Sequence, residues 1–491
     1  MYFKCFIWLV LTCLWRVSSF QSIPNFILFL TDDQDIVLNS MKSLRKVQEE
    51  IVKNGVTFEN AYVNSPVCCP SRSSILTGKY AHNIKVYNNS LNGNCSSFDW
   101  QRNFEKYSIA SYLKNTKNYT TYYAGKYLNR YGDVDAGGLK HVPEGYDWWL
   151  GLKGNSRYYN YTLSVNGTAK FYDKEYLTDV ITTSALDFIR LNHEKPFFMT
   201  LATPACHAPF TAAKRHLHEF PNEKVVKNPS FNFSSDEKHW IVKMPPKSLP
   251  TNISRLDVIQ RKRLQTLLAV DEMVKDIVDE LKNLNVYSNT YLIFTSDNGF
   301  HIGQFGQPWD KRQPYESDIK VPFFISGPDV PKNRVLTNVI TAIDIAPTIL
   351  DLADITVPKD MDGVSLKKML KQYDNSQRYI LIEYWGEGNI ERIDRNCPWK
   401  DGNLTECSQN SWCKCQDSRN NTYTCVLHLS ESTHFKMCIF SDDLGFVEAY
   451  DLRSDPFELR NIAGDIDFEK RVFYRNILHK LTSCEGKSCR F

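Results

Sequence analysis

Short apolar runs alternate with amphipathic segments between residues 25 and 353. Within each run neighbouring residues are apolar, rather than every second residue, and segments with helical periodicity lie between the runs. Strands of this kind are typical of a parallel sheet that is buried on both faces. The pattern therefore predicts an α/β fold in which helices sandwich a large, mainly parallel sheet. The expected strands are Asn25–Leu30, Thr120–Ala124, Phe197–Ala202, Tyr291–Thr295 and Val321–Ile325.

Two segments have the periodicity of buried helices. The clearer one runs from about Asp257 to Leu284, with apolar residues every three or four positions. The second covers Val339–Ala353, and Pro347 is expected to interrupt it.

The pattern changes after about residue 372. Short strand-like pieces, a group of cysteines and a final helix near Asp467–Leu481 predict a smaller α+β domain. We therefore expect a signal peptide over residues 1–19, a large domain over 20–372 and a disulfide-rich domain over 373–491.

The N-terminus has the features of a secretory signal. Lys4 precedes an apolar run from Cys5 to Trp15, which is too short to span a bilayer, and Val17–Ser19 offers small residues for cleavage. No later stretch is long and apolar enough for a membrane helix. Nine N-x-S/T sequons agree with a glycosylated lumenal or extracellular protein: Asn88, Asn94, Asn118, Asn160, Asn166, Asn232, Asn252, Asn403 and Asn420.

The cysteines concentrate near the C-terminus. Eight of them follow residue 390, which predicts a region stapled by disulfides, and Cys484 and Cys489 are expected to pair. Zinc is the weaker alternative because two clean C-x-x-C pairs are missing. Four others lie in the large domain: Cys68, Cys69, Cys95 and Cys206.

Composition narrows the function only slightly. The 491 residues are 42% hydrophobic and 23% charged, as in ordinary globular proteins. A net charge of +3 is too small to indicate nucleic-acid binding, although it is compatible with an anionic substrate.

Polar side chains follow four of the predicted strands. Because ligands bind at the carboxyl ends of strands in an open α/β sheet, these residues are expected to meet. Four of them form an oxygen-only set that suits a divalent cation, with Ca²⁺ favoured over Mg²⁺ and both over zinc. The alternative is that the aspartate pair caps a helix and that Ser-Asp-Asn-Gly is a plain turn. The oxygen ligands are Asp32, Asp33, Asp297 and Asn298.

Three further candidates carry positive charge or a titratable ring. Lys126 follows the strand at residue 124, His207 follows the strand at residue 202, and Lys311 lies in Asp-Lys-Arg. Each alone is most often a surface or structural residue. They become site candidates if an anion binds beside the metal.

Residues 66–80 read PVCCPSRSSILTGKY. Pro70 suits the first turn of a helix, and Gly78 suits its end. Cys68 is then expected just before a helix N-terminus, where backbone N–H groups favour an anion, and Arg72 adds a cation. The plainer alternative is that Cys68 and Cys69 are disulfide partners.

This stretch resembles the sulfatase signature C-x-P-S-R followed by L-T-G. The aspartate pair upstream and Asp-Asn downstream follow in the family's order, and Asp455–Asn461 resembles a structural motif near the family's C-terminus. The resemblance covers nearly the whole chain. It implies the fold of alkaline phosphatases and sulfatases, and a Cα-formylglycine made from Cys68 by the formylglycine-generating enzyme.

The resemblance also implies roles for the candidate residues. Cys68 would supply the nucleophile and would ligate the metal together with the oxygen ligands named above. Lys126 and Lys311 would stabilise the sulfate, Arg72 would hold the hydrated aldehyde, and His207 would contact the leaving oxygen.

Within the family, the chain resembles most the lysosomal enzymes that remove 6-O-sulfate from N-acetylglucosamine at the ends of heparan and keratan sulfate. Extracellular endosulfatases share Arg261–Leu267 but carry a long basic insertion that this chain lacks. An endosulfatase-like secreted enzyme, a phosphate-ester hydrolase and a non-catalytic protein that binds sulfated glycans are the alternatives. The oligomeric state is left open, a homodimer included.

Two positions depart from the family's pattern. Many sulfatases have a histidine two residues after the lysine that corresponds to Lys126, whereas this chain has Leu128. Cys206 is unusual beside His207 and leaves the cysteine count of the large domain uneven.

Overall fold

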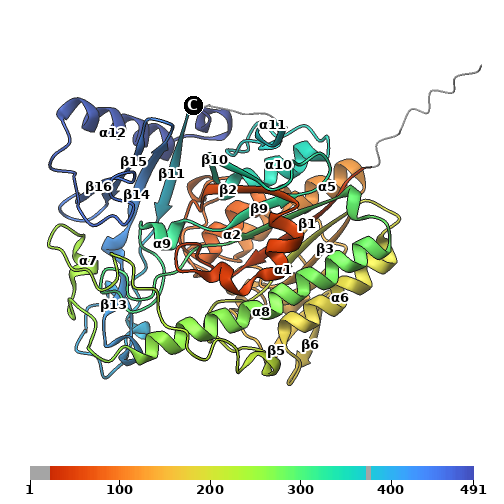
Figure 1. Ribbon diagram of the computed structural model, residues 1–491, viewed down its shortest axis with the longest axis horizontal. Helices are drawn as coiled ribbons and strands as arrows, with labels where there is room; N and C mark the ends of the chain where they lie inside the picture. Colours follow the sequence, from red (N-terminus) through yellow and green to blue (C-terminus); the bar gives the residue numbers. More distant parts are fainter. Residues whose placement is uncertain (1–22, 372–376) are drawn as a thin grey trace, which may run out of the picture.

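The computed structural model describes residues 23–371 and 377–491. The predicted signal peptide and the predicted boundary between residues 372 and 373 lie outside the described residues. Figure 1 shows a large sheet with helices on both faces, and a smaller sheet at one side that belongs to the C-terminal part of the chain.

The large sheet has ten strands in the order β10-β2-β9-β8-β1-β7-β3-β4-β5-β6. Its four central strands, β8, β1, β7 and β3, run parallel, which confirms the predicted mainly parallel centre. The run predicted at 321–325 forms β9, but it pairs antiparallel with both neighbours. The strands are β1 Asn25–Thr31, β2 Gly55–Tyr62, β3 Thr120–Gly125, β4 Trp148–Leu152, β5 Tyr161–Val165, β6 Thr168–Tyr172, β7 Phe197–Ala202, β8 Thr290–Ser296, β9 Phe323–Ser326 and β10 Arg334–Thr341.

Alternate residues of β1 enter two different cores. Phe26, Leu28 and Leu30 pack in the core that contains α2 (Cys68–Thr77), α5 (Ile109–Lys117) and α10 (Ile345–Leu352). Ile27 and Phe29 pack in the core formed with α6 (Leu177–Asn192) and α8 (Ser254–Asn283), which lie side by side in Figure 1. Because both faces of the strand are buried, its sequence is a continuous apolar run.

The predicted long helix is confirmed as α8, with bounds a few residues earlier than expected. The helix predicted over 339–353 is wrong in its first part, because residues 334–341 form β10 and the helix begins only at Ile345. The apolar residues of the strand continue directly into those of the helix, so their pattern hides the boundary. Pro347 lies in the first turn of α10, where a missing N–H costs little, and does not interrupt the helix.

The C-terminal part has an antiparallel sheet in the order β11-β14-β15-β16 and a two-stranded sheet of β12 and β13. Helix α12 (Phe468–Thr482) packs on β14 and β11, and it begins where the side chain of Asp467 accepts a hydrogen bond from Lys470 N. The strands are β11 Arg378–Tyr384, β12 Leu404–Cys407, β13 Cys415–Ser418, β14 Tyr423–Leu429, β15 His434–Phe440 and β16 Val447–Asp451.

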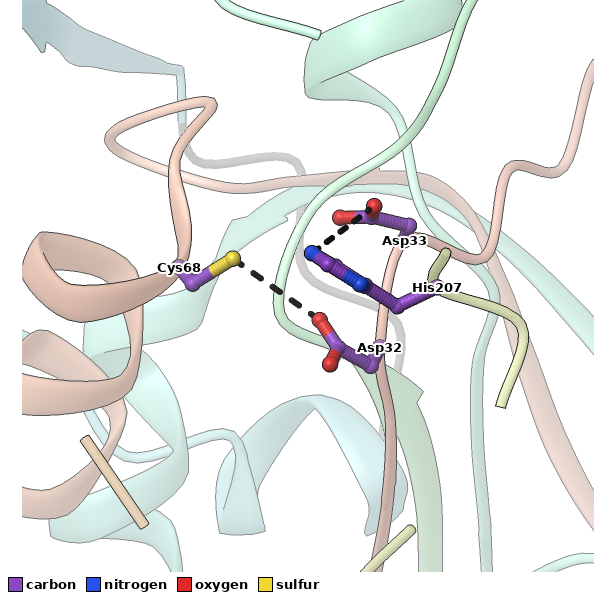
Figure 2. Close-up of side chains that lie close together, drawn as sticks. All are labelled: Asp32, Asp33, Cys68 and His207. Carbon is purple, nitrogen blue, oxygen red and sulfur yellow. Dashed lines mark hydrogen bonds and ion pairs between the residues drawn. The ribbon is translucent and has the colours of Figure 1, made fainter. Parts of the chain in front are cut away.

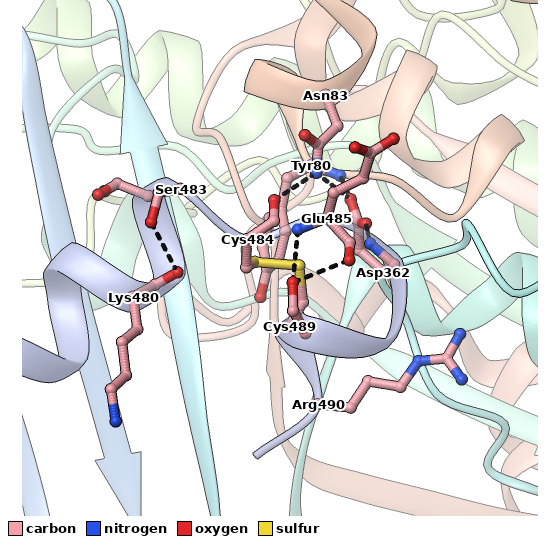
Figure 3. The surroundings of a disulfide bond; sticks show 12 residues. Tyr80, Asn83, Asp362, Lys480, Ser483, Cys484, Glu485, Cys489 and Arg490 are labelled. Atoms are coloured by element: carbon pink, nitrogen blue, oxygen red, sulfur yellow. Dashed lines mark hydrogen bonds between the residues drawn. A yellow bond between two sulfur atoms is a disulfide. The ribbon is translucent and has the colours of Figure 1, made fainter.

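All eight cysteines after residue 390 form disulfides, so the zinc alternative is wrong. The pairs are Cys397–Cys413, Cys407–Cys415, Cys425–Cys438 and Cys484–Cys489, the last as expected. The loop closed by Cys484–Cys489 docks on residues 23–371, where Cys484 O accepts a hydrogen bond from Asn83 and Gly486 N donates to Asp362 (Figure 3).

Shorter helices connect these elements: α1 Arg45–Val47, α3 Ala81–Ile84, α4 Phe98–Asn103, α7 Trp240–Lys243, α9 Glu316–Ile319 and α11 Lys367–Lys371. Among the described residues, no helix combines the length and the apolar character needed to cross a bilayer.

Candidate active site

The four central strands bring the predicted polar residues to one edge of the sheet. Asp32 and Asp33 follow β1, Asp297 follows β8, and His207 follows β7. The backbone N–H of Asp33 donates to Asp297 Oδ1 at 3.1 Å, which joins the ends of β1 and β8. Asp33 has a positive φ of 60°, in the left-handed region that aspartate enters more readily than most residues.

Cys68 faces this cluster from the first turn of α2. Cys68 is the first residue of α2 and Val67 is the N-cap, so the helix begins one residue earlier than the sequence predicted. Figure 2 shows the sulfur of Cys68 directed at Asp32, with 3.7 Å between Sγ and Oδ1. One ligand atom from each of Asp32, Asp33, Cys68 and His207 lies within 4.8 Å of the others. Cys68 is buried and unpaired, so the Cys68–Cys69 disulfide is excluded.

Each buried carboxylate has its own cationic partner. Lys126 Nζ lies 2.7 Å from Asp32 Oδ2, and Lys311 Nζ lies 2.6 Å from Asp33 Oδ1. Arg72 Nε lies 2.7 Å from Asp297 Oδ2, and its Nη1 donates to Lys126 O at 2.7 Å. Three cations thus balance three carboxylates in a volume from which water is nearly excluded.

Burial and the neighbouring charges give the three carboxyl groups different pKa values. Burial opposes ionisation of Asp32, but Lys126 and His207 hold its pKa well below the usual range. Burial likewise opposes ionisation of Asp33, and Lys311 lowers its pKa. For Asp297 burial prevails over Arg72 and raises the pKa to about 6.

Lys126 reaches the cluster because the chain turns sharply after β3. Gly125 has φ 105°, and a Cβ atom there would lie 1.9 Å from Ala202 O. Lys126 N donates to the same carbonyl at 2.8 Å. Only glycine permits this close approach of β3 to β7, so Gly125 positions the lysine.

His207 presents one ring nitrogen to the site. Its Nδ1 lies 2.6 Å from Ala208 O, and its Nε2 lies 3.8 Å from Asp33 Oδ2. Burial lowers the pKa of His207, and the charge of Lys311 lowers it further. The neighbouring Cys206 is buried and unpaired, and its N–H donates to Asp32 O at 2.6 Å. Cys206 therefore aligns the strand ends rather than forming a disulfide.

The donor set fits a hard divalent cation. Asn298 donates from Nδ2 to Asp33 Oδ1 at 2.7 Å, while its buried Oδ1 has no hydrogen-bond partner among the described residues. An unsatisfied buried oxygen beside three carboxylates is the arrangement that Ca²⁺ or Mg²⁺ would complete. The structure thus brings together every residue that the sequence predicted for the metal.

Two supporting residues escaped the sequence analysis. The hydroxyl of Ser156 donates to Asp32 Oδ2 from the loop after β4, a strand that the apolar pattern did not reveal. Arg263 of α8 donates to Asp33 O at 2.7 Å and to Asp35 Oδ1 at 2.8 Å. No local pattern distinguishes Arg263, because the buried residues of α8 also include Gln260, Gln265 and Asp271. By contrast, Leu128 is fully buried in the hydrophobic core, so it offers no substitute for the family's histidine.

A cavity of about 240 Å³ opens onto the cluster. Asp33, His207 and Lys311 line its inner end, and residues of the C-terminal part, including Arg392 and Glu406, line its outer end. A larger groove of about 800 Å³ lies between β6 and α6, but it contains none of the clustered residues.

The sequence is similar to those of known sulfatases. The family model described as Sulfatase matches residues 24–355. The chain is 45% identical over 480 residues to N-acetylglucosamine-6-sulfatase of Homo sapiens. The aligned region covers 95% of this chain and 86% of the human protein. The chain is 38% identical over 370 residues to the extracellular sulfatase SULF-1 homolog of Drosophila melanogaster, covering 74% of this chain but 32% of that protein.

A similar fold is found in a solved structure of a protein in complex with its substrate D-glucosamine-2-N,6-O-disulfate. The TM-score is 0.73 at 22% sequence identity, with 95% of this chain and 98% of that chain covered.

Proposed function

Because the chain belongs to the sulfatase family, we propose that it removes 6-O-sulfate from N-acetylglucosamine at the non-reducing end of heparan and keratan sulfate fragments. The observation that carries the proposal is the convergence of Cys68, the three carboxylates and Asn298 with Lys126, Lys311 and His207 at one strand edge. The 45% identity over 95% of the chain supports this substrate.

Conversion of Cys68 to formylglycine by the formylglycine-generating enzyme is favoured by its place in the C-x-P-S-R signature. Burial raises the pKa of its thiol to about 12, although Lys126 and Lys311 oppose the shift. An unmodified cysteine would stay protonated and would be a poor nucleophile at neutral or acidic pH. Hydrated formylglycine supplies two hydroxyl groups on one carbon, one to attack sulfur and one whose loss of a proton expels sulfate.

Asp32, Asp33, Asp297 and Asn298 would hold one divalent cation together with residue 68. All four oxygen-bearing side chains are buried, and this oxygen set favours Ca²⁺ over Mg²⁺. Such an ion lowers the pKa of a bound hydroxyl and polarises the sulfate ester.

The chain's own charges would then act on the substrate. With the carboxylates engaged by an ion, Lys126 and Lys311 are free to pair with sulfate oxygens and to stabilise the charge that develops on them. Arg72 lies one turn into α2 and orients residue 68 through its contacts with Asp297 and Lys126 O. His207 lines the cavity, so its ring is placed to contact the sugar oxygen as that oxygen leaves. Its imidazolium form, which the lowered pKa confines to acidic pH, would give that oxygen a proton.

The same reasoning assigns a compartment. Nine sequons and an N-terminal apolar run suit a glycoprotein of the secretory pathway, and we propose the lysosome, where glycosaminoglycans are degraded. Secretion in the manner of the extracellular sulfatases is the second candidate, favoured by the 38% identity to the Drosophila protein.

Two measurements on one purified preparation test the proposal. Mass spectrometry of the peptide that contains residue 68 should show formylglycine or its hydrate, and N-acetylglucosamine 6-sulfate should release sulfate. Release of phosphate from the matching 6-phosphate at an equal rate would favour a phosphate-ester hydrolase. Release from the interior of intact heparan chains as fast as from their ends would favour an endosulfatase, and binding without release a non-catalytic protein.

A further inference from the structure

A second polar cavity adjoins the catalytic cavity. Asn89 and Arg392 line both of them. The second cavity has a volume of about 500 Å³, and Arg130, Arg419 and Glu387 also line it. This volume is within the range of small-ligand sites, so a further sugar unit has room beside the one that carries the sulfate.

The wall between the two cavities is held in place from the motif helix. Cys69 forms a disulfide with Cys95, which closes the loop that contains Asn89. The side chain of Asn89 accepts a hydrogen bond from Cys69 N at 2.9 Å, and its backbone N–H donates to Glu387 Oε1 at 3.1 Å. The cysteine that follows Cys68 in the sequence thus fixes the loop over which a substrate would extend.

The second cavity carries an excess of positive charge. Its carboxylate, Glu387, lies 3.5 Å from the guanidinium of Arg312, so its charge is already compensated. Arg392 pairs with Glu406, and Arg130 pairs with Asp133 at 2.8 Å. Within residues 23–371 and 377–491, no carboxylate forms an ion pair with Arg419, whose side chain is exposed.

An unpaired guanidinium in the lining of a sugar-sized cavity suits a carboxylate or sulfate, because both match its planar set of donors. We propose that the second cavity binds the anionic group of the sugar that follows the terminal N-acetylglucosamine 6-sulfate, and that Arg419 contacts this group. The inference rests on the proposed function and extends it from the terminal sugar to the next one. In a heparan fragment the group is the carboxylate of a uronic acid, and in a keratan fragment it is the sulfate of a sulfated galactose.

Steady-state kinetics of the full-length enzyme test this subsite. The substrates are N-acetylglucosamine 6-sulfate alone, and the same sugar linked to a uronic acid, to galactose or to galactose 6-sulfate. Arg419→Gln should lower kcat/KM for the two disaccharides with an anionic second sugar roughly tenfold more than for the monosaccharide, mainly through KM. A selective loss with one of the two anionic disaccharides supports the proposal and identifies which group binds.

Arg395→Gln is the matched control, because Arg395 is another exposed arginine of the C-terminal part and lines neither cavity. Equal losses of kcat/KM on all four substrates after Arg419→Gln would overturn the subsite. It would also be overturned if the wild-type enzyme had the same kcat/KM for the galactose disaccharide as for the two disaccharides with an anionic second sugar. Failure of the wild-type enzyme to release sulfate from any substrate would instead overturn the proposed function, so the two failures are distinguishable.

A glycan is the competing occupant, because Asn88 lines the cavity and begins a sequon. Enzymatic deglycosylation of the folded protein separates the two. Unchanged preference for the anionic disaccharides supports the subsite. A roughly tenfold gain in their kcat/KM after deglycosylation would show that the glycan fills the cavity, and would overturn the proposal.

Discussion

The two sheets of this molecule are stabilised in different ways. The ten-stranded sheet is covered by helices on both faces, and a single disulfide, Cys69–Cys95, is found in residues 23–371. The four-stranded sheet packs one face into the large core and the other into a smaller one, and four disulfides lie in residues 377–491. A large core can bury enough apolar surface to tolerate a cluster of charges, whereas a small one depends on covalent links.

The difference also separates the two tasks of the protein. The large sheet supplies the clustered carboxylates, lysines and Cys68, all at the ends of rigid parallel strands. The C-terminal part supplies Arg392, Glu406 and Arg419 at the rim of the cavities, from loops and short strands tied by disulfides. The carboxylate cluster therefore belongs to the first region, whereas both regions line the cavities that would hold the rest of the substrate.

The largest expected effect comes from residue 68. Cys68→Ala should lose all measurable turnover, because no hydroxyl remains to attack sulfur. Cys68→Ser keeps one hydroxyl and should give at most one slow turnover, after which the protein is heavier by one sulfo group. Weighing the intact variants after incubation with substrate distinguishes these outcomes. Sustained turnover by the serine variant would contradict the role assigned to two hydroxyls on one carbon.

The next effect concerns the buried charges of the large sheet. Asp297→Ala removes a metal ligand and leaves the buried guanidinium of Arg72 without its 2.7 Å partner. Activity should fall by about 100-fold or more, and unfolding free energy by about 3 kcal/mol. The control Asp360→Ala removes the half-exposed partner of Lys79 and should change stability by less than about 1 kcal/mol. Normal activity of Asp297→Ala in metal-free buffer would rule out an essential cation.

The sequence predicted the centre of the molecule better than its borders. The strands β1, β3, β7 and β8 are buried on both faces, so their residues are continuously apolar and the polar residues that follow them stand out. Strand β2 carries Glu59 and Asn60 and was missed, and β10 merged with the helix after it. Arg263 and Ser156 reach the site only through tertiary packing, which no local pattern encodes.

The disulfides test the division between chemistry and stability. Cys425 and Cys438 face each other across β14 and β15, and replacing both by alanine should cost about 3 kcal/mol of stability while leaving the activity of the folded fraction unchanged. Replacing Cys69 and Cys95 by alanine should have a similar cost, but it should also raise KM, because the loop with Asn89 is released. Thermal unfolding, kinetics and the formylglycine content of each variant check this. Equal kinetic effects of the two double variants would contradict it.

The smallest expected effect lies where the two regions meet. His82 of α3 contacts Glu383 of β11, with 3.0 Å between Nδ1 and Oε1, and its Nε2 lies 3.1 Å from Cys484 O in the loop shown in Figure 3. Burial opposes protonation of this ring, but the hydrogen bond and charge of Glu383 raise its pKa to about 9. An unfolded histidine has a pKa of about 6.5, so the folded state binds the proton more tightly. The resulting stabilisation, up to about 3 kcal/mol, is complete below pH 6.5 and is lost as the pH rises through about 9. Between pH 6.5 and 9 the melting temperature of the wild-type protein should therefore fall more steeply than that of His82→Gln. The control His218→Gln, at an exposed position, should show the same fall as the wild type. Parallel curves for wild type and His82→Gln would show that the contact between the two regions does not depend on this proton.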